Sequence, residues 1–401
     1  MRWSRRKDSE DLAAAEEDKI SPATIVLTGS TGNLGCYILD VLLRNPRVEA
    51  VHCLNRGADA AARQLGLLAQ RGLQKDQKNL ADDPRIHFHQ CDLAEPRLGL
   101  SPASADAIAA TATHYLHCAW PVDWNQSYSS FEPAVRGVSG LVSFVLEAKT
   151  NAKLFFISSV AAAGNWGAIP GAHLDVPEEE LDDWKVARFG YGQSKLVSER
   201  LMGHASRTSG LTGAVCRIGQ VGGPVDHGEE GSWPAQEWLP SLLLSSRYLN
   251  TVPADLGPMD DVDWVPVDRL ADIVTELLLS KQDDGSMAFH HVVNPVRKPW
   301  KEVMSVVKEK LPSAEPVNID KWTLRLEQSA EEMADASDVG DNPAVKLLPV
   351  FLDVADKAVH LPKARAATLS LKHTIKRSPT LARLEPVNDT WMSLWLKQLS
   401  L

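Results

Sequence analysis

Short apolar runs alternate with amphipathic stretches along most of the chain. The apolar runs are rich in β-branched and aromatic residues, and they fall at 25–27, 48–56, 86–91, 114–118, 154–159, 213–221 and 288–295. Helical periodicity lies between several of them, for example at Ile38, Leu39 and Leu42, and again over 133–148 and 270–279. Strands that alternate with amphipathic helices build parallel sheets covered on both faces. The pattern therefore predicts an α/β fold, a Rossmann-type doubly wound parallel sheet.

The remaining segments predict a second, mainly helical C-terminal lobe. We expect the sheet domain to comprise 21–222 plus 263–295, and the substrate lobe to comprise 223–262 plus 296–401. Residues 1–20 are rich in charge and contain no apolar signal core, so they are predicted to be a linker or a disordered N-terminal segment.

One strand-to-helix junction carries three glycines spaced three residues apart. Gly29 permits a sharp turn, Gly32 lets the main chain approach a pyrophosphate, and Gly35 lets helix and strand pack tightly. The start of the following helix offers free N–H groups and a positive dipole end to the anion. Glycine-rich turns are common in loops, but the strand-to-helix context favours dinucleotide binding. The expected contacts are Thr28, Gly29, Ser30, Thr31, Gly32, Asn33, Leu34 and Gly35.

The end of the second strand suggests which dinucleotide binds. In this fold, an acidic residue there bonds the ribose 2′-hydroxyl, but this chain has Asn55 and Arg56 instead. The Arg56 guanidinium can grip a 2′-phosphate, and Arg63 on the next helix can add a second cation. We therefore predict NADPH as the cofactor, the alternative being that Arg56 is a solvated turn residue. Further expected cofactor contacts are Asp92, Leu93 and Ala119, at the ends of the third and fourth strands.

Candidate catalytic residues follow the fifth strand. Ser158 and Ser159 end that strand at the carboxyl edge of the sheet, where open α/β sheets bind ligands. Tyr191 and Lys195 are four residues apart at the start of a predicted helix, so they share one face. A nearby ammonium group is expected to lower the tyrosine pKa and to suit the phenol for proton exchange with a carbonyl oxygen. The alternative is an ordinary surface Tyr/Lys pair, which the upstream hydroxyls and glycine turn disfavour.

Composition narrows the function classes further. The chain has 401 residues, 44% of them hydrophobic, and a formal net charge of −10, which gives nucleic-acid binding no electrostatic support. No apolar run approaches the ~20 residues that span a bilayer. The five cysteines form no C-x-x-C pair, so we expect reduced core thiols in a cytoplasmic protein. His87 and His89 alternate on a predicted strand, but no further ligands accompany them and no metal site is predicted.

Four motifs together resemble an extended short-chain dehydrogenase/reductase. They are Thr28-Gly29-x-Thr31-Gly32-x-Leu34-Gly35, the strand end at Ser159, Tyr191-x-x-x-Lys195, and Arg217-x-Gly219-Gln220-Val221-x-Gly223-Pro224. The residues of regions 120–124 and 378–381 add to this likeness. The chain is similar to the terminal thioester reductase domains of nonribosomal peptide synthetase-like enzymes and carboxylic acid reductases of fungi. The likeness runs from about residue 21 to the end.

The resemblance implies a role for each matched residue. Ser159 would hydrogen-bond the substrate carbonyl, with Ser158 as its rival if the register shifts by one. Tyr191 would donate the proton, and Lys195 would tune Tyr191 and hold the nicotinamide ribose. The implied reaction is NADPH-dependent reductive release, as an aldehyde or further to an alcohol, of an acyl group on the phosphopantetheine arm of a carrier domain.

The sequence alone leaves other functions open. The chain would be an excised domain or would work with a carrier supplied elsewhere, and as an isolated domain it is expected to be monomeric. A free-standing ketone reductase or sugar epimerase has the same fold and needs no carrier arm. A non-catalytic dinucleotide-binding regulator would tend to lose the tyrosine or lysine, and both are present. A fatty acyl-CoA reductase is a close relative without a visible membrane anchor here.

Overall fold

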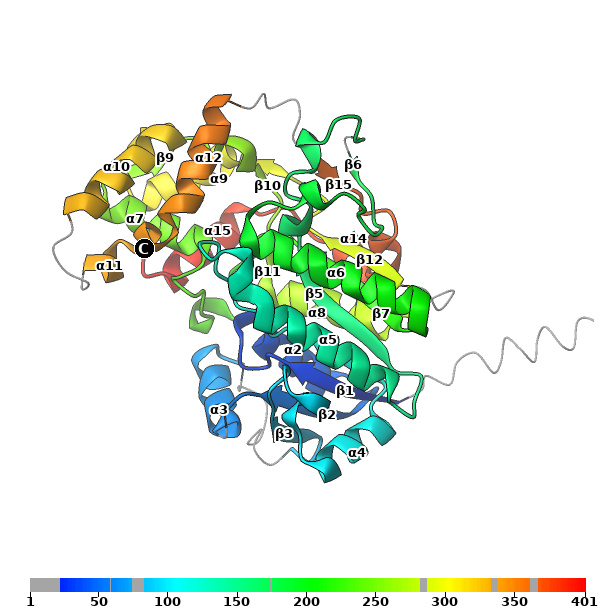
Figure 1. Ribbon diagram of the computed structural model, residues 1–401. Helices are drawn as coiled ribbons and strands as arrows, with labels where there is room; N and C mark the ends of the chain where they lie inside the picture. The colour runs from blue at the N-terminus through cyan, green and yellow to red at the C-terminus, as the bar shows by residue number, and fades with distance from the viewer. Residues whose placement is uncertain are drawn as a thin grey trace, which may run out of the picture.

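A computed structural model describes residues 22–57, 59–73, 83–173, 175–281, 287–332, 338–360 and 367–401. Its centre is a parallel seven-stranded sheet in the order β12-β7-β5-β4-β1-β2-β3 (Figure 1). The strands are β1 (Ala23–Thr28), β2 (Val48–Asn55), β3 (Ile86–Gln90), β4 (His114–His117), β5 (Lys153–Ser159), β7 (Thr212–Ile218) and β12 (Met287–Val292). The sheet confirms the predicted Rossmann-type fold, and the strand order reverses between β1 and β4.

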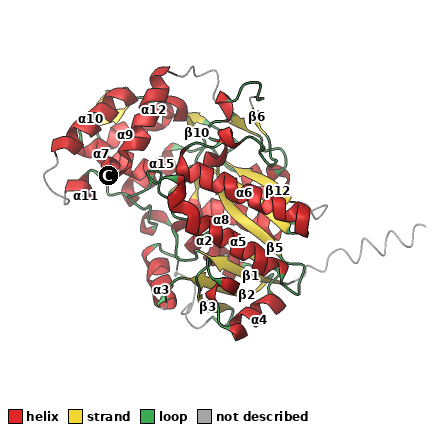
Figure 2. Ribbon diagram, in the orientation of Figure 1, coloured by secondary structure: helices red, strands yellow, loops and turns green. Residues whose placement is uncertain are grey.

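Helices cover both faces of the sheet, as Figure 2 shows. The helices before the C-terminal region are α2 (Asn33–Arg44), α3 (Ala60–Gln70), α4 (Pro102–Thr111), α5 (Glu132–Leu146), α6 (Phe189–Ser209) and α8 (Val267–Leu279). One apolar core lies between the sheet and α2, α3 and α8, and it includes Leu27 and Phe155. A second core, with Val26 and Phe156, lies under α4, α5 and α6 on the opposite face. Neighbouring strand residues thus serve opposite faces, as the pleat requires.

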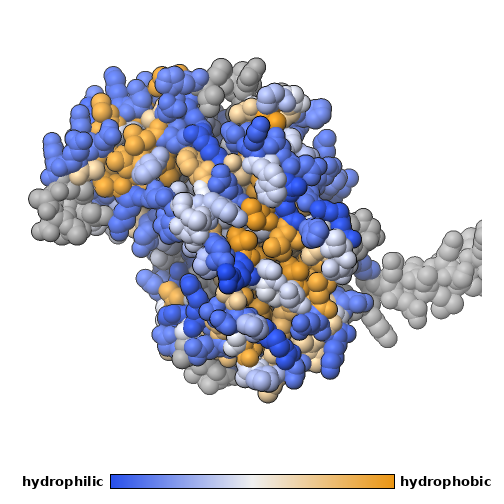
Figure 3. All heavy atoms as spheres, in the orientation of Figure 1, coloured by the Kyte–Doolittle hydropathy of each residue, from blue (hydrophilic) through white to orange (hydrophobic). Residues whose placement is uncertain are grey.

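A third apolar core forms the helical lobe. It is built by α7 (Trp238–Tyr248), α9 (Trp300–Lys310), α10 (Ile319–Glu332), α12 (Leu348–His360) and α15 (Asp389–Gln398), with the short α11 (Asp338–Asp341) beside them. Fully buried tryptophans, Trp264, Trp300, Trp322 and Trp395, fill its interior. The core residues come from both chain segments predicted for the lobe, but Trp264 comes from 263–295, which was predicted for the sheet domain. On the face drawn in Figure 3, hydrophobic residues gather over α6 and over this lobe.

Short strand pairs connect the chain segments around the sheet. They are β6 (Asp175–Val176) with β15 (Thr368–Leu369), β8 (Val221–Gly222) with β11 (Val265–Pro266), β9 (Thr251–Pro253) with β14 (Glu315–Val317), and β10 (Asp261–Val262) with β13 (Lys298–Pro299). The C-terminal region also returns to the sheet: α13 (Thr374–Arg377) and α14 (Pro379–Ala382) follow β15, and Leu381 and Leu384 join the core on α8. Within the predicted lobe segment 296–401, this stretch therefore packs on the sheet domain. The predicted linker, 1–20, lies outside the described residues.

The turn between β1 and α2 brings strand and helix into close contact, and mutation of its glycines can test that contact. A Cβ added at Gly35 would lie 2.0 Å from the Gly29 carbonyl oxygen, whereas one at Gly66, on the exposed side of α3, meets no atom within 4 Å. We expect Gly35→Ala to lower the free energy of unfolding by at least about 1–3 kcal/mol, and Gly66→Ala to raise it by about 0.5–1 kcal/mol. Urea unfolding measures both, and unchanged stability of Gly35→Ala would contradict the tight strand–helix contact.

Candidate active site

The glycine turn is shaped as a cradle for a bulky anion. Gly29 has a φ of +75°, and a Cβ there would lie 2.7 Å from the Ala119 backbone nitrogen. Gly32 is the N-cap of α2, and no side chain caps the first N–H groups of this helix. These N–H groups and the helix dipole favour a phosphate at this end. The residues present therefore fit the pyrophosphate of a dinucleotide.

A polar contact ties the turn to the end of β4. The backbone N–H of Ala119 donates to Thr28 Oγ1 over 3.2 Å, and the same hydroxyl shares a 2.7 Å hydrogen bond with Nδ1 of His117. Burial, and secondarily the charge of Lys195, lowers the pKa of His117 to about 3, so this ring is neutral. Thr28 and Ala119, two of the predicted cofactor contacts, therefore lie against each other. The sequence analysis missed His117, because only the pairing of β1 with β4 brings it to the turn.

The end of β2 holds the turn from the other side. The buried Asn55 side chain donates to Ser30 Oγ over 3.1 Å and accepts from Thr31 Oγ1 over 3.4 Å. Asn55 thus braces the glycine turn at the position where related folds place a carboxylate.

The predicted adenosine-end residues lie just beyond Asn55. The exposed Arg56 lines a hollow of about 650 Å³ that Cys91 and Asp92 also line. Arg63 lies close by, because a Cβ on Gly57 would come within 3.4 Å of its guanidinium. Leu93 packs against α5, where it would contact a Cβ on Gly137. Arg56, Arg63 and Asp92 therefore gather at one end of the cradle.

Two of the predicted catalytic hydroxyls lie together at the end of β5. The Ser159 hydroxyl lies close enough to the Tyr191 hydroxyl to act on its pKa, and it accepts a hydrogen bond from the backbone N–H of Ala161 over 3.2 Å. Gly190 and Gly192 flank Tyr191, and a Cβ on either would lie 2.4 Å from a backbone carbonyl oxygen of a neighbouring segment. Gly192 lets the start of α6 approach Ala161, just after β5, whereas Gly190 lets it approach the segment 126–128. The geometry places Ser159 beside Tyr191, whereas the Ser158 hydroxyl points to Glu199.

Lys195 lies in a buried aromatic niche beside the tyrosine. Its Nζ donates to the Ile157 carbonyl over 2.7 Å and lies 4.1 Å from the ring centroid of Trp120 and 4.6 Å from that of Phe156. Burial lowers the pKa of Lys195 to about 7. Cation–π attraction partly offsets that desolvation.

The expected lowering of the tyrosine pKa is wrong for this structure. Burial raises the pKa of Tyr191 to about 12, while the hydrogen bond from Ser159 acts in the opposite direction. The lysine ammonium lies 5.8 Å from the Tyr191 ring centroid and is engaged by Ile157. Desolvation of the phenolate therefore outweighs the attraction of the nearby cation.

The helical lobe contacts the glycine turn through a residue that the sequence analysis missed. Asn33 Nδ2 donates to Glu237 Oε1 over 2.8 Å, and Trp233 Nε1 donates to Glu237 Oε2 over 3.1 Å. Arg71 Nε donates to Asn33 Oδ1 over 3.4 Å. Glu237 is the N-cap of α7, in the predicted lobe segment. Asn33 therefore links the phosphate end of the cradle to the lobe, over more than two hundred residues of chain.

The predicted histidine pair stands beside a third histidine. His52 Nδ1 and His89 Nε2 share a 3.0 Å hydrogen bond, and the His52 ring stacks on His87 at 4.9 Å. Burial lowers the pKa of His52 to about 4. Among the residues that the structure describes, no group of His, Cys, Asp and Glu is arranged to hold a metal ion.

The cysteines at 36, 53, 91, 118 and 216 are free thiols, as predicted. Within the described ranges, no helix is both long and apolar enough to cross a membrane.

The sheet and the glycine turn together define a Rossmann-type, dinucleotide-binding class of protein. Residues 27–274 match the male sterility protein family, and the chain belongs to this family of NAD-binding domains.

Similar proteins share this architecture. The chain is 33% identical to a carboxylic acid reductase of Neurospora crassa over 98% of its own length and 37% of the relative. It is 30% identical to the adenylate-forming reductase Nps9 of Serpula lacrymans over 99% of its length and 36% of the relative. The terminal R domain from the myxalamid PKS-NRPS pathway superposes with a TM-score of 0.74 at 22% identity, covering 94% of this chain and 90% of that domain. The chain thus spans about a third of these two curated relatives.

The Asn33–Glu237 contact predicts a pH dependence of stability. Burial raises the pKa of Glu237 to about 7, above its ordinary value of 4.5. The folded protein therefore binds this proton more tightly than the unfolded chain, and it loses stability as the pH rises through this range. We expect Glu237→Gln, which cannot ionise, to raise the melting temperature relative to wild type more at pH 8 than at pH 4. Calorimetry at both pH values measures this, with exposed Glu302→Gln as control, and an equal effect at both would exclude the raised pKa.

Proposed function

We propose that the chain is an NADPH-dependent reductase domain that releases an acyl group from a carrier-bound thioester as an aldehyde. One observation carries the proposal: the Ser159 and Tyr191 hydroxyls meet beside buried Lys195, at the carboxyl edge of the sheet that also presents the glycine cradle. Aligned hydroxyl donors of this kind stabilise the negative charge that develops on a carbonyl oxygen. Two curated relatives are named as reductases of carboxylic acids or as adenylate-forming reductases, which supports an acyl substrate.

The side chains divide the work in the proposed reaction. NADPH, when bound, supplies the hydride. Ser159 donates a hydrogen bond to the thioester carbonyl oxygen, and Tyr191 gives the same oxygen its proton. Because burial raises the pKa of Tyr191 to about 12, the phenol is protonated at neutral pH, as a proton donor must be. Collapse of the resulting thiohemiacetal yields the aldehyde and the free thiol of the arm, and a second round would yield an alcohol.

Lys195 is assigned to hold the nicotinamide ribose and to place positive charge near the phenol. Its Nζ reaches the Ile157 carbonyl in the structure, so this main-chain oxygen anchors the ammonium within the site. Trp120 and Phe156 cover it and restrict water at the reacting centre. Hydroxyl acceptors of a bound ribose would offset the effect of burial on the pKa of Lys195.

The proposed preference for NADPH rests on Arg56 and Arg63. Both lie near the end of β2, where the polar group that braces the turn is the neutral Asn55. A carboxylate at that position would repel a 2′-phosphate, whereas an exposed guanidinium can bind it with paired hydrogen bonds.

The proposed partner is a carrier domain that presents the acyl group on a phosphopantetheine arm. The names of the relatives support a setting in secondary metabolism, where such domains follow an adenylating or polyketide-forming module. We assign 223–262 plus 296–401, apart from the stretch with α13 and α14 that packs on the sheet, to the substrate lobe that receives the acyl group, and 21–222 plus 263–295 to cofactor binding. Exposed Trp184 and Phe189, close to the start of α6, offer apolar surface near the site.

The proposed activity is tested with NADPH and a panel of acyl-pantetheine thioesters. We expect NADPH consumption with formation of an aldehyde, and Tyr191→Phe is expected to reduce kcat by about 10²-fold or more because the proton donor is lost. Fluorescence titration is expected to show nearly unchanged NADPH affinity for this variant. Brisk ketone reduction without turnover of any thioester would reject the thioester assignment, and full activity of Tyr191→Phe would remove this residue from the mechanism.

The cofactor preference is tested at Arg56. We expect Arg56→Asp to weaken NADPH binding by about tenfold or more, because a charge-assisted contact of about 1.5–3 kcal/mol is lost, while NADH binding changes little. Dissociation constants for both dinucleotides measure this. Arg136→Ala, an exposed arginine on α5, is the control and should change neither constant. Equal weakening of both dinucleotides would show that Arg56 does not read the 2′-phosphate.

A further inference from the structure

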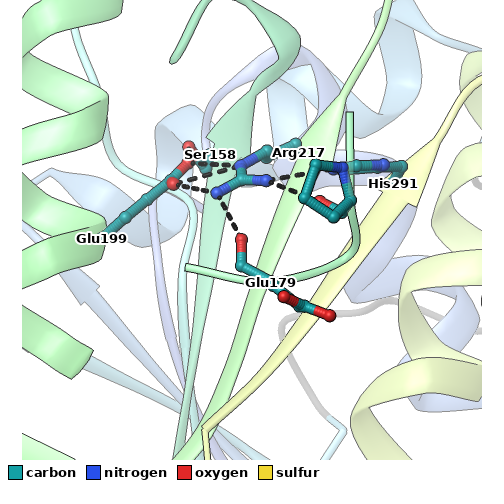
Figure 4. Close-up of polar contacts among 6 residues, drawn as sticks. Ser158, Glu179, Glu199, Arg217 and His291 are labelled. Carbon is teal, nitrogen blue, oxygen red and sulfur yellow. Dashed lines mark hydrogen bonds and ion pairs between the residues drawn. The ribbon is translucent and has the colours of Figure 1, made fainter. Parts of the chain in front are cut away.

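A charged cluster without access to solvent lies behind the candidate active site, between α6 and the sheet (Figure 4). Glu199 on α6 and Arg217 on β7 are both fully buried, with 0% of either side chain exposed. Arg217 Nη2 donates to Glu199 Oε2 over 2.7 Å, and its Nε lies 3.2 Å and 3.1 Å from the two carboxylate oxygens. Ser158 on β5 donates to Glu199 Oε1 over 2.5 Å. The cluster therefore connects one helix to two neighbouring strands.

The remaining N–H groups of Arg217 reach two further segments. Nη1 bonds His291 Nε2 on β12 over 3.1 Å and the Pro177 carbonyl over 3.4 Å, and Nη2 donates to the Glu179 carbonyl over 3.0 Å. His291 Nδ1 lies 2.9 Å from the Ser370 carbonyl, so Nδ1 carries the proton and Nε2 accepts from Arg217. Burial lowers the pKa of His291 to about 3, which agrees with a neutral ring. Every donor of the guanidinium is thereby satisfied.

Stability alone does not explain this ion pair. Removing two charges from water costs about as much as their attraction returns, and apolar residues of similar size can replace such pairs without loss of stability. A buried pair that is fully hydrogen-bonded specifies one arrangement of its elements instead.

The helix that this ion pair fixes is α6, which carries Tyr191 and Lys195. Residues 191, 195 and 199 lie four apart and form one stripe on α6. Around these positions the buried face of α6 is mostly small or polar, with Gly192, Ser194 and Ser198 among its buried residues. Such a face offers few apolar side chains whose packing could set the position of the helix.

Three consecutive residues of β5 each hold one residue of this stripe. Ser159 lies beside Tyr191, the Ile157 carbonyl accepts from Lys195, and Ser158 donates to Glu199. The third contact differs from the other two because it lies outside the reacting site and is anchored to β7 by Arg217. It is thus placed to fix α6 on β5 independently of substrate or cofactor.

We propose that the Glu199–Arg217 pair, with Ser158 and His291, is a positioning element that sets α6 on β5 and thereby aligns Tyr191 and Lys195 with Ser159. This role rests on the proposed function, in which those three residues act on a carbonyl. None of the positioning residues touches the reacting atoms. A displacement of about 1 Å in such an alignment can cost about 10²-fold in rate.

The test uses Glu199→Gln and the milder Ser158→Ala, with Ser198→Ala as the matched control. Ser198 is a buried serine on the same helix, and its hydroxyl bonds only the Ser194 carbonyl of α6 among the contacts observed. We expect both network variants to lower kcat, by about tenfold or more for Glu199→Gln, with KM for the thioester and the NADPH dissociation constant changed less than threefold. Hydrogen exchange of the segment 189–199 should accelerate in both variants, and Ser198→Ala should match wild type in every measurement.

The outcomes separate the two proposals. The positioning role is overturned if the variants keep the wild-type kcat and the wild-type hydrogen-exchange rate of 189–199. It is also overturned if activity falls only in proportion to the folded fraction. Should Glu199→Gln fail to fold, Ser158→Ala decides by the same readouts. If wild type reduces an aldehyde but no thioester, the proposed function fails while kcat on the aldehyde still tests positioning. If wild type reduces no carbonyl at all, exchange of 189–199 tests the fixing of α6 on its own.

Discussion

The contact between the end of β5 and the start of α6 is the constraint on which the candidate active site depends. A strand and a helix that are far apart in sequence must meet closely enough for a serine hydroxyl to reach a phenol. Gly192 removes the side chain that would prevent this approach, because a Cβ there would lie 2.4 Å from the Ala161 carbonyl oxygen. Because the buried face of α6 there is small and polar, hydrogen bonds fix its place where most helices rely on apolar packing.

A second close approach forms the cofactor cradle on the neighbouring strands. Gly29 passes so near Ala119 that no side chain fits between them, and Thr28 fastens the same two segments through Ala119 and His117. The His117 ring in turn stacks on Phe156 of β5, which lies against Lys195. The phosphate end and the proposed catalytic end are therefore connected by packed side chains across β1, β4 and β5. Ligand binding at this strand edge follows from the reversal of strand order between β1 and β4.

The sequence sufficed for features that local pattern determines. Alternating strands and helices predicted the parallel sheet, and the three glycines predicted the turn, because each depends on residues close together in the chain. Contacts between distant segments could not be predicted in the same way. Glu237 meets Asn33 across the lobe boundary, and Arg217 stood in a recognised motif without any sign that Glu199 is its partner. The choice between Ser158 and Ser159 likewise needed the position of α6, since both hydroxyls end the same strand.

The pKa of Tyr191 shows why residue spacing alone predicted the wrong direction for its shift. Tyr191 and Lys195 are four positions apart on a helix, which places a cation near a phenol and predicts a lower tyrosine pKa. The helix also buries both groups, and burial acts on each toward its neutral form: the phenol holds its proton to a pKa of about 12, while the lysine loses its proton near pH 7. A protonated phenol suits a step in which a carbonyl oxygen must receive a proton, whereas removal of a proton from an alcohol requires the phenolate. Protonated Tyr191 is thus the form that the proposed release of an aldehyde requires.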